Sequence, residues 1–186
     1  MRLIAAGVLA WGEAGASFGL FTSGGPTLKT IGVISDTHGL LRPEALVALQ
    51  GSDLLVHAGD IGSADVIGTL QDLAPVFAVR GNVDGEAWAS RFPKTQVVEV
   101  GGVLLYVLHN VNELDLDPVA ANFRVVISGH SHRPSVTTHH SVLYLNPGSA
   151  GRRRFRLPVT VAKLVVEAGL PYAEIIELPV QPDSGT

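Results

Sequence analysis

Hydrophobic and polar positions follow two different patterns along the chain, and the change divides it into two halves. Between residues 31 and 79, three short apolar runs are separated by two segments whose apolar residues recur at helical spacing. The runs predict buried strands at 31–35, 53–57 and 76–79, and the intervening segments predict helices at 43–49 and 64–73. This order is typical of neighbouring parallel strands with helices covering the sheet.

The second half is dominated by strands. Apolar and alternating runs predict them at 96–100, 103–108, 125–128, 142–145, 159–166 and 173–178. Gly101-Gly102 and residues 139–141 predict hairpin turns, and residues 118–123 form at most a short helix. No internal repeat and no linker follow residue 30, so we expect one mixed α/β layered domain over residues 30–186.

Residues 1–29 have a different character. An apolar stretch with one Arg is followed by Gly- and Ser-rich sequence up to Pro26. A secretory signal peptide has this order, but its first segment is usually more basic. We predict an N-terminal extension without function, either disordered or the product of a start site assigned too far upstream.

Composition narrows the class of protein. With 46% hydrophobic and 16% charged residues, the 186-residue chain is not a disordered polypeptide. Its 13 basic and 17 acidic side chains leave a net charge of −4, which excludes a basic surface for duplex nucleic acid. The absence of Cys excludes disulfides, thiolate metal sites and Cys nucleophiles, and is compatible with the cytoplasmic location that we expect. The apolar runs are shorter than the ~20 residues of a membrane span, so we expect no membrane association.

Polar side chains with ligand chemistry follow five of the predicted strands. Because ligands bind outside the carboxyl ends of strands in open α/β sheets, these side chains are expected to converge. Each is an ordinary turn residue when taken alone, but coincidence does not readily place five such groups in order at strand ends. The residues concerned are Asp36, His38, Asp60, Asn82, His109, His130 and His132.

Seven oxygen and nitrogen ligands without a thiolate suit Mn²⁺, Fe or Zn²⁺. One ion takes four to six ligands, so seven imply two ions that share one ligand. A shared carboxylate holds two ions ~3.5–4 Å apart, close enough to clamp a phosphate. Asp60 is the predicted bridge, because it lies in the middle of the series and carboxylates bridge where imidazoles cannot.

The motif series resembles the calcineurin-like metallophosphoesterase superfamily, and within it the small phosphodiesterases of the YfcE type. The series runs Asp36-x-His38, Gly59-Asp60, Gly81-Asn82-x-Asp84, His109 and Gly129-His130-Ser-His132. Asn146-Pro-Gly-Ser149 is a further mark of this branch, and the resemblance covers roughly residues 30 to 180.

The resemblance implies a four-layer αββα sandwich of two mixed sheets flanked by helices. It also implies one ion on Asp36, His38 and His132 and a second on Asn82, His109 and His130, with Asp60 between them. Mn²⁺ is the favoured ion, with Fe, Zn²⁺, Ni²⁺ and Co²⁺ as alternatives. The implied reaction is hydrolysis of a small phosphodiester by a metal-bridging hydroxide, in which Asp60, Asn82 and His109 position hydroxide and phosphate. A homodimer or higher homo-oligomer is a possible assembly.

Two positions depart from the family pattern. Gly usually follows the histidine at position 109 closely, but Asn110 stands here, so His109 is the loosest match. Many phosphomonoesterase relatives have a His at position 83 that protonates the leaving group. Val83 cannot do so, which favours substrates with good leaving groups.

Several residues near the motifs carry two interpretations. Asp84 either orients Asn82 or a metal-bound water, or is a surface turn acid. His57 either packs in the core or supports the ligands by a hydrogen bond, and Arg80 either faces substrate phosphate or is solvated. Asn146 is a further candidate for supporting the site. The Arg-rich segment 152–156 either attracts an anionic substrate or is a solvated loop or subunit contact.

Two other functions use the same features. A phosphomonoesterase or nucleotide phosphatase would keep the site and change the substrate. A scaffold like the small subunit of the eukaryotic retromer coat would keep the fold but lose ligand histidines, whereas all seven candidate ligands are present here.

Overall fold

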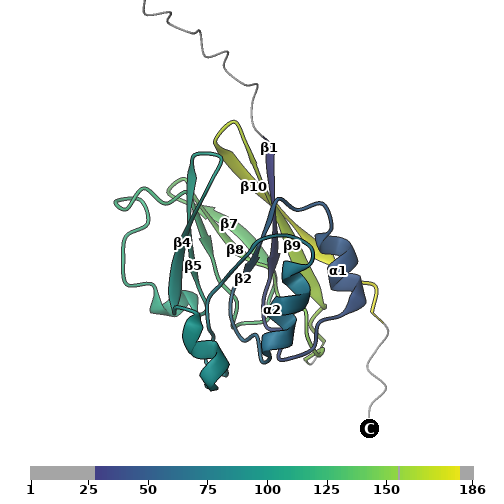
Figure 1. Cartoon of the computed structure of the whole chain (residues 1–186). Coiled ribbons are helices and arrows are strands. Elements are labelled where there is room, and N and C mark those ends of the chain that lie inside the picture. The colour runs from purple at the N-terminus through teal and green to yellow at the C-terminus, as the bar shows by residue number, and fades with distance from the viewer. Residues whose placement is uncertain (1–27, 155, 181–186) are drawn as a thin grey trace, which may run out of the picture.

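Two mixed five-stranded sheets pack face to face in the computed structural model, which describes residues 28–154 and 156–180 (Figure 1). The first sheet has the order β10-β9-β1-β2-β3, with β1 (Leu28–Ile34), β2 (Leu54–His57), β3 (Val76–Ala78), β9 (Thr160–Glu167) and β10 (Leu170–Glu177). The second has the order β4-β5-β6-β8-β7, with β4 (Thr95–Val100), β5 (Val103–Leu108), β6 (Val125–Ile127), β7 (Ser135–His139) and β8 (Val142–Asn146). Strands β1, β2 and β3 are parallel, as the order of elements predicts.

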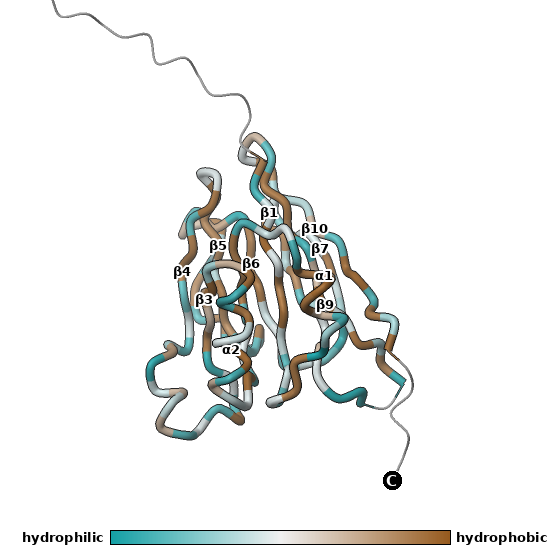
Figure 2. The backbone as a smooth tube through the Cα atoms, turned by 45° about the vertical axis from the view of Figure 1, so that its right-hand side comes forward, coloured by the Kyte–Doolittle hydropathy of each residue, from teal (hydrophilic) through white to brown (hydrophobic). Residues whose placement is uncertain are grey.

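The core between the sheets follows from the alternation of side chains along each strand. In β5, Val103, Leu105 and Val107 face the opposite sheet, whereas Tyr106 and Leu108 face the outer layer. Figure 2 shows this concentration of hydrophobic residues in the strands, with more hydrophilic loops at the lower end of the molecule. Both faces of the central strands are therefore buried, and polar side chains gather where the strands end.

The outer layers differ between the two sheets. Helices α1 (Pro43–Leu49) and α2 (Ala64–Gln71) cover the first sheet and bury Leu49, Ile67 and Leu70 against it. The second sheet is covered by the segment after β5, which contains only the short 3₁₀ helix η2 (Val111–Glu113). The layered sandwich is confirmed, with a loop segment serving as its fourth layer; residues 118–123 form hydrogen-bonded turns.

Strand β7 and the 3₁₀ helix η1 (Ala87–Arg91) are among the elements that the hydrophobic pattern did not predict. Strand β7 consists of five exposed residues with no apolar alternation, and it forms because a hairpin places it beside β8 at the edge of the sheet. Helix η1 is too short to show a helical period. Hydrophobic periodicity detects elements that cover a core, and these two contribute little to it.

The N-terminal strand begins earlier than its apolar run. Leu28 and Lys29 belong to β1 and pair with Glu167 and Val166 of β9, so the predicted extension over residues 1–29 is two residues too long. The rest of that extension lies outside the described residues. Within the described part of the chain, no helix is long and apolar enough to cross a membrane.

Candidate metal centre

All seven candidate ligands lie at one end of the sandwich, since they follow the carboxyl ends of β1, β2, β3, β5 and β6 and contact one another. Backbone hydrogen bonds hold the first two loops together. The Asp36 N–H donates to Gly59 O over 3.0 Å, and the His38 N–H donates to Asp60 O over 2.9 Å. The parallel pairing of β1 with β2 thus continues into the loops and fixes the spacing between Asp36, His38 and Asp60.

The first group consists of Asp36, His38 and His132. Asp36 is fully buried, and its Oδ1 lies 3.2 Å from His132 Nε2. The Nε2 atoms of His38 and His132 lie 3.4 Å apart. Burial lowers the pKa of His38; Asp60 opposes this effect, and the positive charge of Arg154 adds to it. Burial thus favours the neutral form of the His38 imidazole beside this carboxylate.

The second group forms around the side-chain oxygen of Asn82. His109 Nε2 and His130 Nδ1 each lie 3.1 Å from Asn82 Oδ1. His109 Nδ1 lies 2.8 Å from Ala58 O, and since a carbonyl only accepts, Nδ1 carries a proton and donates it. The Nε2 atom of His109 faces the oxygen of Asn82 and can donate to it when the ring is protonated.

Asp60 lies between the two groups. Its Oδ2 is 3.8 Å from His38 Nε2 and its Oδ1 is 3.3 Å from His109 Nε2. Burial opposes its ionisation, but hydrogen bonds from His109 and from the Val83 N–H lower the pKa of Asp60 to about 2. Burial likewise opposes protonation of His109, but its hydrogen bonds to Asp60 and Ala58 O outweigh this and raise its pKa. Asp60 is thus a carboxylate at neutral pH, with one oxygen facing each group.

The atoms left without hydrogen bonds indicate what this arrangement can hold. Among the described residues, Asp36 Oδ1 and His132 Nδ1 are buried without a hydrogen-bond partner. Buried polar groups are normally satisfied, so an unsatisfied carboxylate oxygen beside imidazole nitrogens favours a bound cation. Asp36, His38 and His132 form one candidate cation site, and Asp36, Asp60 and His109 form a second. Oxygen and imidazole donors fit a divalent transition metal.

The backbone at the ligands adopts a conformation that the sequence pattern did not predict. Asp36, His38, Asp60, His130 and His132 have positive φ values between 48° and 67°. A left-handed conformation costs roughly 1–2 kcal/mol for each non-glycine residue. Such strain persists only where the surrounding structure enforces it, and it clusters at functional sites.

Two glycines next to the ligands leave no space for a side chain. A Cβ at Gly81 would collide with Asp60 Oδ1, and a Cβ at Gly129 would collide with Ser35 Oγ and approach Asp36 Oδ2. The glycines that accompany Asn82 and His130 in the sequence therefore allow the ligand loops to approach one another closely.

Asp84 is a buried structural carboxylate, which rules out the interpretation as a surface turn acid. Its two oxygens accept hydrogen bonds from the N–H groups of Ile61, Gly62 and Gly81 over 2.8–3.1 Å. It joins the loop after β2 to the loop after β3, and so fixes the separation between Asp60 and Asn82. Asp84 thus supports Asn82 through the Gly81 backbone.

His57 is fully buried, as the core alternative requires, and both of its nitrogens are hydrogen-bonded. Nδ1 accepts from the Gly59 N–H over 3.2 Å, so Nε2 carries the proton and donates it to Thr37 Oγ1 over 2.9 Å. Thr37 Oγ1 donates in turn to Ile61 O. This chain of bonds holds the backbone between Asp36 and His38, and it requires a neutral imidazole.

We expect His57 to make the stability of the protein depend on pH. Burial lowers its pKa from 6.5 to about 4, so the folded protein resists protonation that the unfolded chain accepts. Stability is therefore complete above pH 6.5 and is lost as the pH falls toward 4, by roughly 3 kcal/mol. Urea unfolding in the presence of a chelator should show a smaller loss between pH 7 and pH 4.5 for His57→Asn than for the wild type. Equal losses in the two proteins would contradict this role.

The other predicted residues are placed as follows. Asn146 is buried and contacts the His130 loop: its Nδ2 donates to Gly129 O over 2.7 Å and to Ser131 Oγ over 3.1 Å. Two serines that support Asp36 were not predicted. The Ser35 hydroxyl donates to Asp36 Oδ2 over 2.5 Å, and the Ser149 hydroxyl donates to Asp36 O. Serines at strand ends are too common in sequences to single these out.

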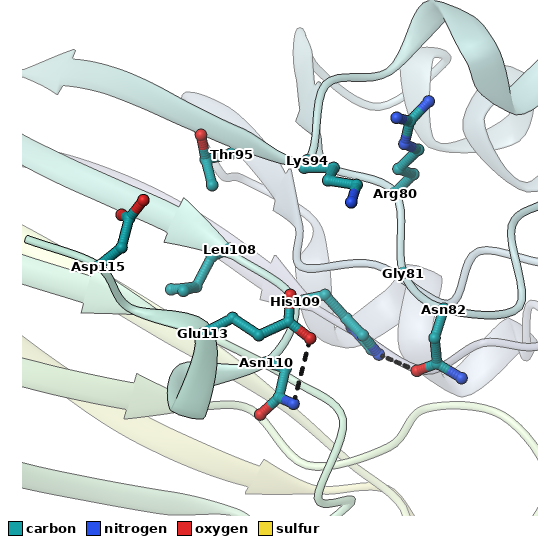
Figure 3. A pocket seen from close by; sticks show the side chains of 10 residues that line it. All are labelled: Arg80, Gly81, Asn82, Lys94, Thr95, Leu108, His109, Asn110, Glu113 and Asp115. Atoms are coloured by element: carbon teal, nitrogen blue, oxygen red, sulfur yellow. Dashed lines mark hydrogen bonds between the residues drawn. The ribbon is translucent and has the colours of Figure 1, made fainter.

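A cavity of about 330 Å³ opens beside the second group (Figure 3). Asn82 and His109 form one end of it, and Arg80 also lines it. In Figure 3 the Arg80 guanidinium points away from Asn82, whereas the ammonium group of Lys94 extends toward His109. The candidate metal centre therefore continues into a space that can receive part of a small molecule.

The comparisons with known proteins agree on one family. A sequence model of the calcineurin-like phosphoesterase superfamily domain matches residues 30–169. A probable metallophosphoesterase from Methanocaldococcus jannaschii is 34% identical over 160 residues, which cover 79% of this chain and 80% of the relative.

Three solved structures share the fold. A novel archaeal phosphodiesterase matches with a TM-score of 0.67 and 24% identity, over 80% of this chain and 99% of its own. The YfcE phosphoesterase of E. coli matches with a TM-score of 0.58 and 22% identity, over 80% and 99%. Vacuolar protein sorting 29 from Cryptosporidium parvum matches with a TM-score of 0.65 and 17% identity, over 81% and 98%. At these identities the structural matches show the fold alone.

Proposed function

Because the chain belongs to the calcineurin-like phosphoesterase superfamily, we propose that it is a phosphodiesterase that uses two divalent metal ions. The observation that carries the proposal is the position of Asp60, with one carboxylate oxygen toward His38 and the other toward His109. Asp36, His38 and His132 would hold one ion, and Asn82, His109 and His130 the other. Mn²⁺ is the proposed ion.

When bound, two such ions supply Lewis-acid chemistry: they lower the pKa of water and neutralise charge on the phosphoryl oxygens. The residues of the chain hold the reacting groups in place. Asn82 is exposed, and with its Oδ1 directed at the two histidines, its Nδ2 is available to donate to a phosphoryl oxygen. The ionised Asp60 keeps negative charge between the two groups, which favours two cations at this spacing.

The environment of position 83 favours diesters with good leaving groups. The Val83 backbone N–H donates to Asp60 Oδ1 over 3.1 Å, but its exposed side chain has no proton to give a leaving oxygen. General acid catalysis contributes about 10²–10⁴-fold where it operates. Because residue 83 supplies no general acid, we expect faster hydrolysis of substrates whose leaving group departs as a stable anion.

The backbone of the site also argues against a scaffold function. Five candidate ligands have positive φ values, which cost stability and offer nothing to a surface that only binds another protein. The complete ligand set and this local strain together favour a catalytic site.

The assay that tests the proposal uses bis(p-nitrophenyl) phosphate. We expect purified protein with added Mn²⁺ to release nitrophenol, to lose this activity in a chelator and to regain it when Mn²⁺ is restored. p-Nitrophenyl phosphate, the corresponding monoester, should be the poorer substrate, since diesters are the proposed class. Absence of metal-dependent turnover by well-folded protein would overturn the proposal.

A further inference from the structure

The cavity beside Asn82 and His109 has walls of opposite charge. Lys94 precedes β4 and provides positive charge on one side, next to Arg80, which follows β3 and whose guanidinium points away from Asn82 (Figure 3). The segment after β5 provides Glu113 and Asp115 on the other. The volume of about 330 Å³ lies within the range of small-molecule sites.

The side of the cavity that carries Lys94 is fixed by a backbone hydrogen bond, and its positive charge is not neutralised by an ion pair among the described residues. The Arg80 N–H donates to Pro93 O over 3.0 Å, which ties the end of β3 to the residue before Lys94. Within residues 28–154 and 156–180, Lys94 forms no ion pair with an acidic group, although two carboxylates line the opposite wall. Lys94 is exposed, and its ammonium extends over the cavity toward His109 (Figure 3). It is therefore available to an anionic ligand.

The acidic wall is formed where the chain departs from the family pattern. Asn110 follows His109, and its Oδ1 accepts from the Asn112 N–H over 3.1 Å at the start of η2. The short helix presents Glu113, whose Oε1 is contacted by Asn110 Nδ2 at 3.5 Å. Carboxylates in this position can accept hydrogen bonds from hydroxyl groups of a ligand.

Building on the proposed function, we propose that this cavity binds one substituent of the diester and that Lys94 recognises a second anionic group on that substituent. Glu113 and Asp115 accept hydrogen bonds from its hydroxyls. The substrate class is then a phosphodiester in which one alcohol is a phosphorylated sugar or polyol. Lys94 is a residue that determines specificity, outside the metal centre itself.

Binding to the Mn²⁺-loaded protein tests this inference without turnover. Calorimetric titration should give adenosine 3′,5′-bisphosphate a dissociation constant about tenfold lower than that of adenosine 5′-phosphate, the effect of one charge-assisted hydrogen bond, and both ligands keep a free 2′-hydroxyl for the acidic wall. Lys94→Gln should abolish this preference and Lys94→Arg should retain most of it. Lys163→Gln, which removes a charge on β9, should leave the preference unchanged.

An unchanged preference in Lys94→Gln would overturn the inference, as would the lack of any preference in the wild type. Hydrolysis of bis(p-nitrophenyl) phosphate by the same preparations separates the two claims. A Lys94-dependent preference without hydrolysis would support the cavity and contradict the proposed function. Hydrolysis without such a preference would support the proposed function and contradict the role of Lys94.

Discussion

Replacing Asp60 by Asn is expected to remove more bound metal than either Asp36→Asn or Asn82→Ala. The substitution barely changes volume, and the remaining carbonyl oxygen can still accept from the Val83 N–H. The NH₂ group then takes the place of the oxygen that faces His38 and cannot coordinate a cation. Because the negative charge between the two groups is also lost, binding of both ions is weakened. In the proposed assignment Asn82 and Asp36 are each a ligand of one ion, although Asp36 also lies within reach of Asp60 and His109.

Elemental analysis of purified, folded protein measures this order directly. Phosphodiesterase activity should fall in parallel by several powers of ten, since metal ions contribute several kcal/mol and each ~1.4 kcal/mol is tenfold. If Asp60→Asn retained two metals and near-full turnover while Asp84→Asn did not, the bridging role would belong to Asp84 instead.

Replacing Asp84 by Ala should reduce the stability of the metal-free protein by roughly 2–4 kcal/mol. Three backbone N–H groups, those of Ile61, Gly62 and Gly81, lose their acceptor at once. A buried donor without a partner costs about 1–3 kcal/mol, which applies in full to Ile61, whereas Gly81 is half-buried and Gly62 is exposed, so that water offsets part of their loss. This loss is a large fraction of the 5–15 kcal/mol that stabilises a typical domain.

Urea unfolding in the presence of a chelator measures the effect. Asp72→Ala is the matched control, because Asp72 is exposed at the end of α2, and its loss should change stability by no more than ~0.5 kcal/mol. If Asp84→Ala unfolded at the wild-type urea concentration yet failed to bind metal, Asp84 would act as a ligand and not as a structural acceptor.

The sequence was sufficient to predict the strands that carry the core and the residues that converge at their ends. The continuous apolar run of β5 matches its bounds, Val103–Leu108, because each of its faces is buried by a different layer. The motif series predicted the superfamily that the sequence model and the relative from M. jannaschii show. Both predictions rest on local signals: apolar runs, and ligand residues that follow them.

The remaining features depend on contacts between segments distant in sequence. Strand β7 has no apolar alternation, and its pairing with β8 determines it. The alternatives for Asp84 and His57 were resolved only when the loops after β1, β2 and β3 came together and supplied their hydrogen-bond partners. Likewise, the cavity beside His109 is formed by three segments, none of which indicates a cavity by its own composition.

Anomalous diffraction from crystals soaked in Mn²⁺ tests the central claim most directly, because it locates the ions independently of activity. We expect two peaks ~3.5–4 Å apart, the separation of two-metal sites. One should lie beside Asp36, His38 and His132 and the other beside Asn82, His109 and His130, with the Asp60 carboxylate between them. A single peak, or two peaks that do not share Asp60, would contradict the account.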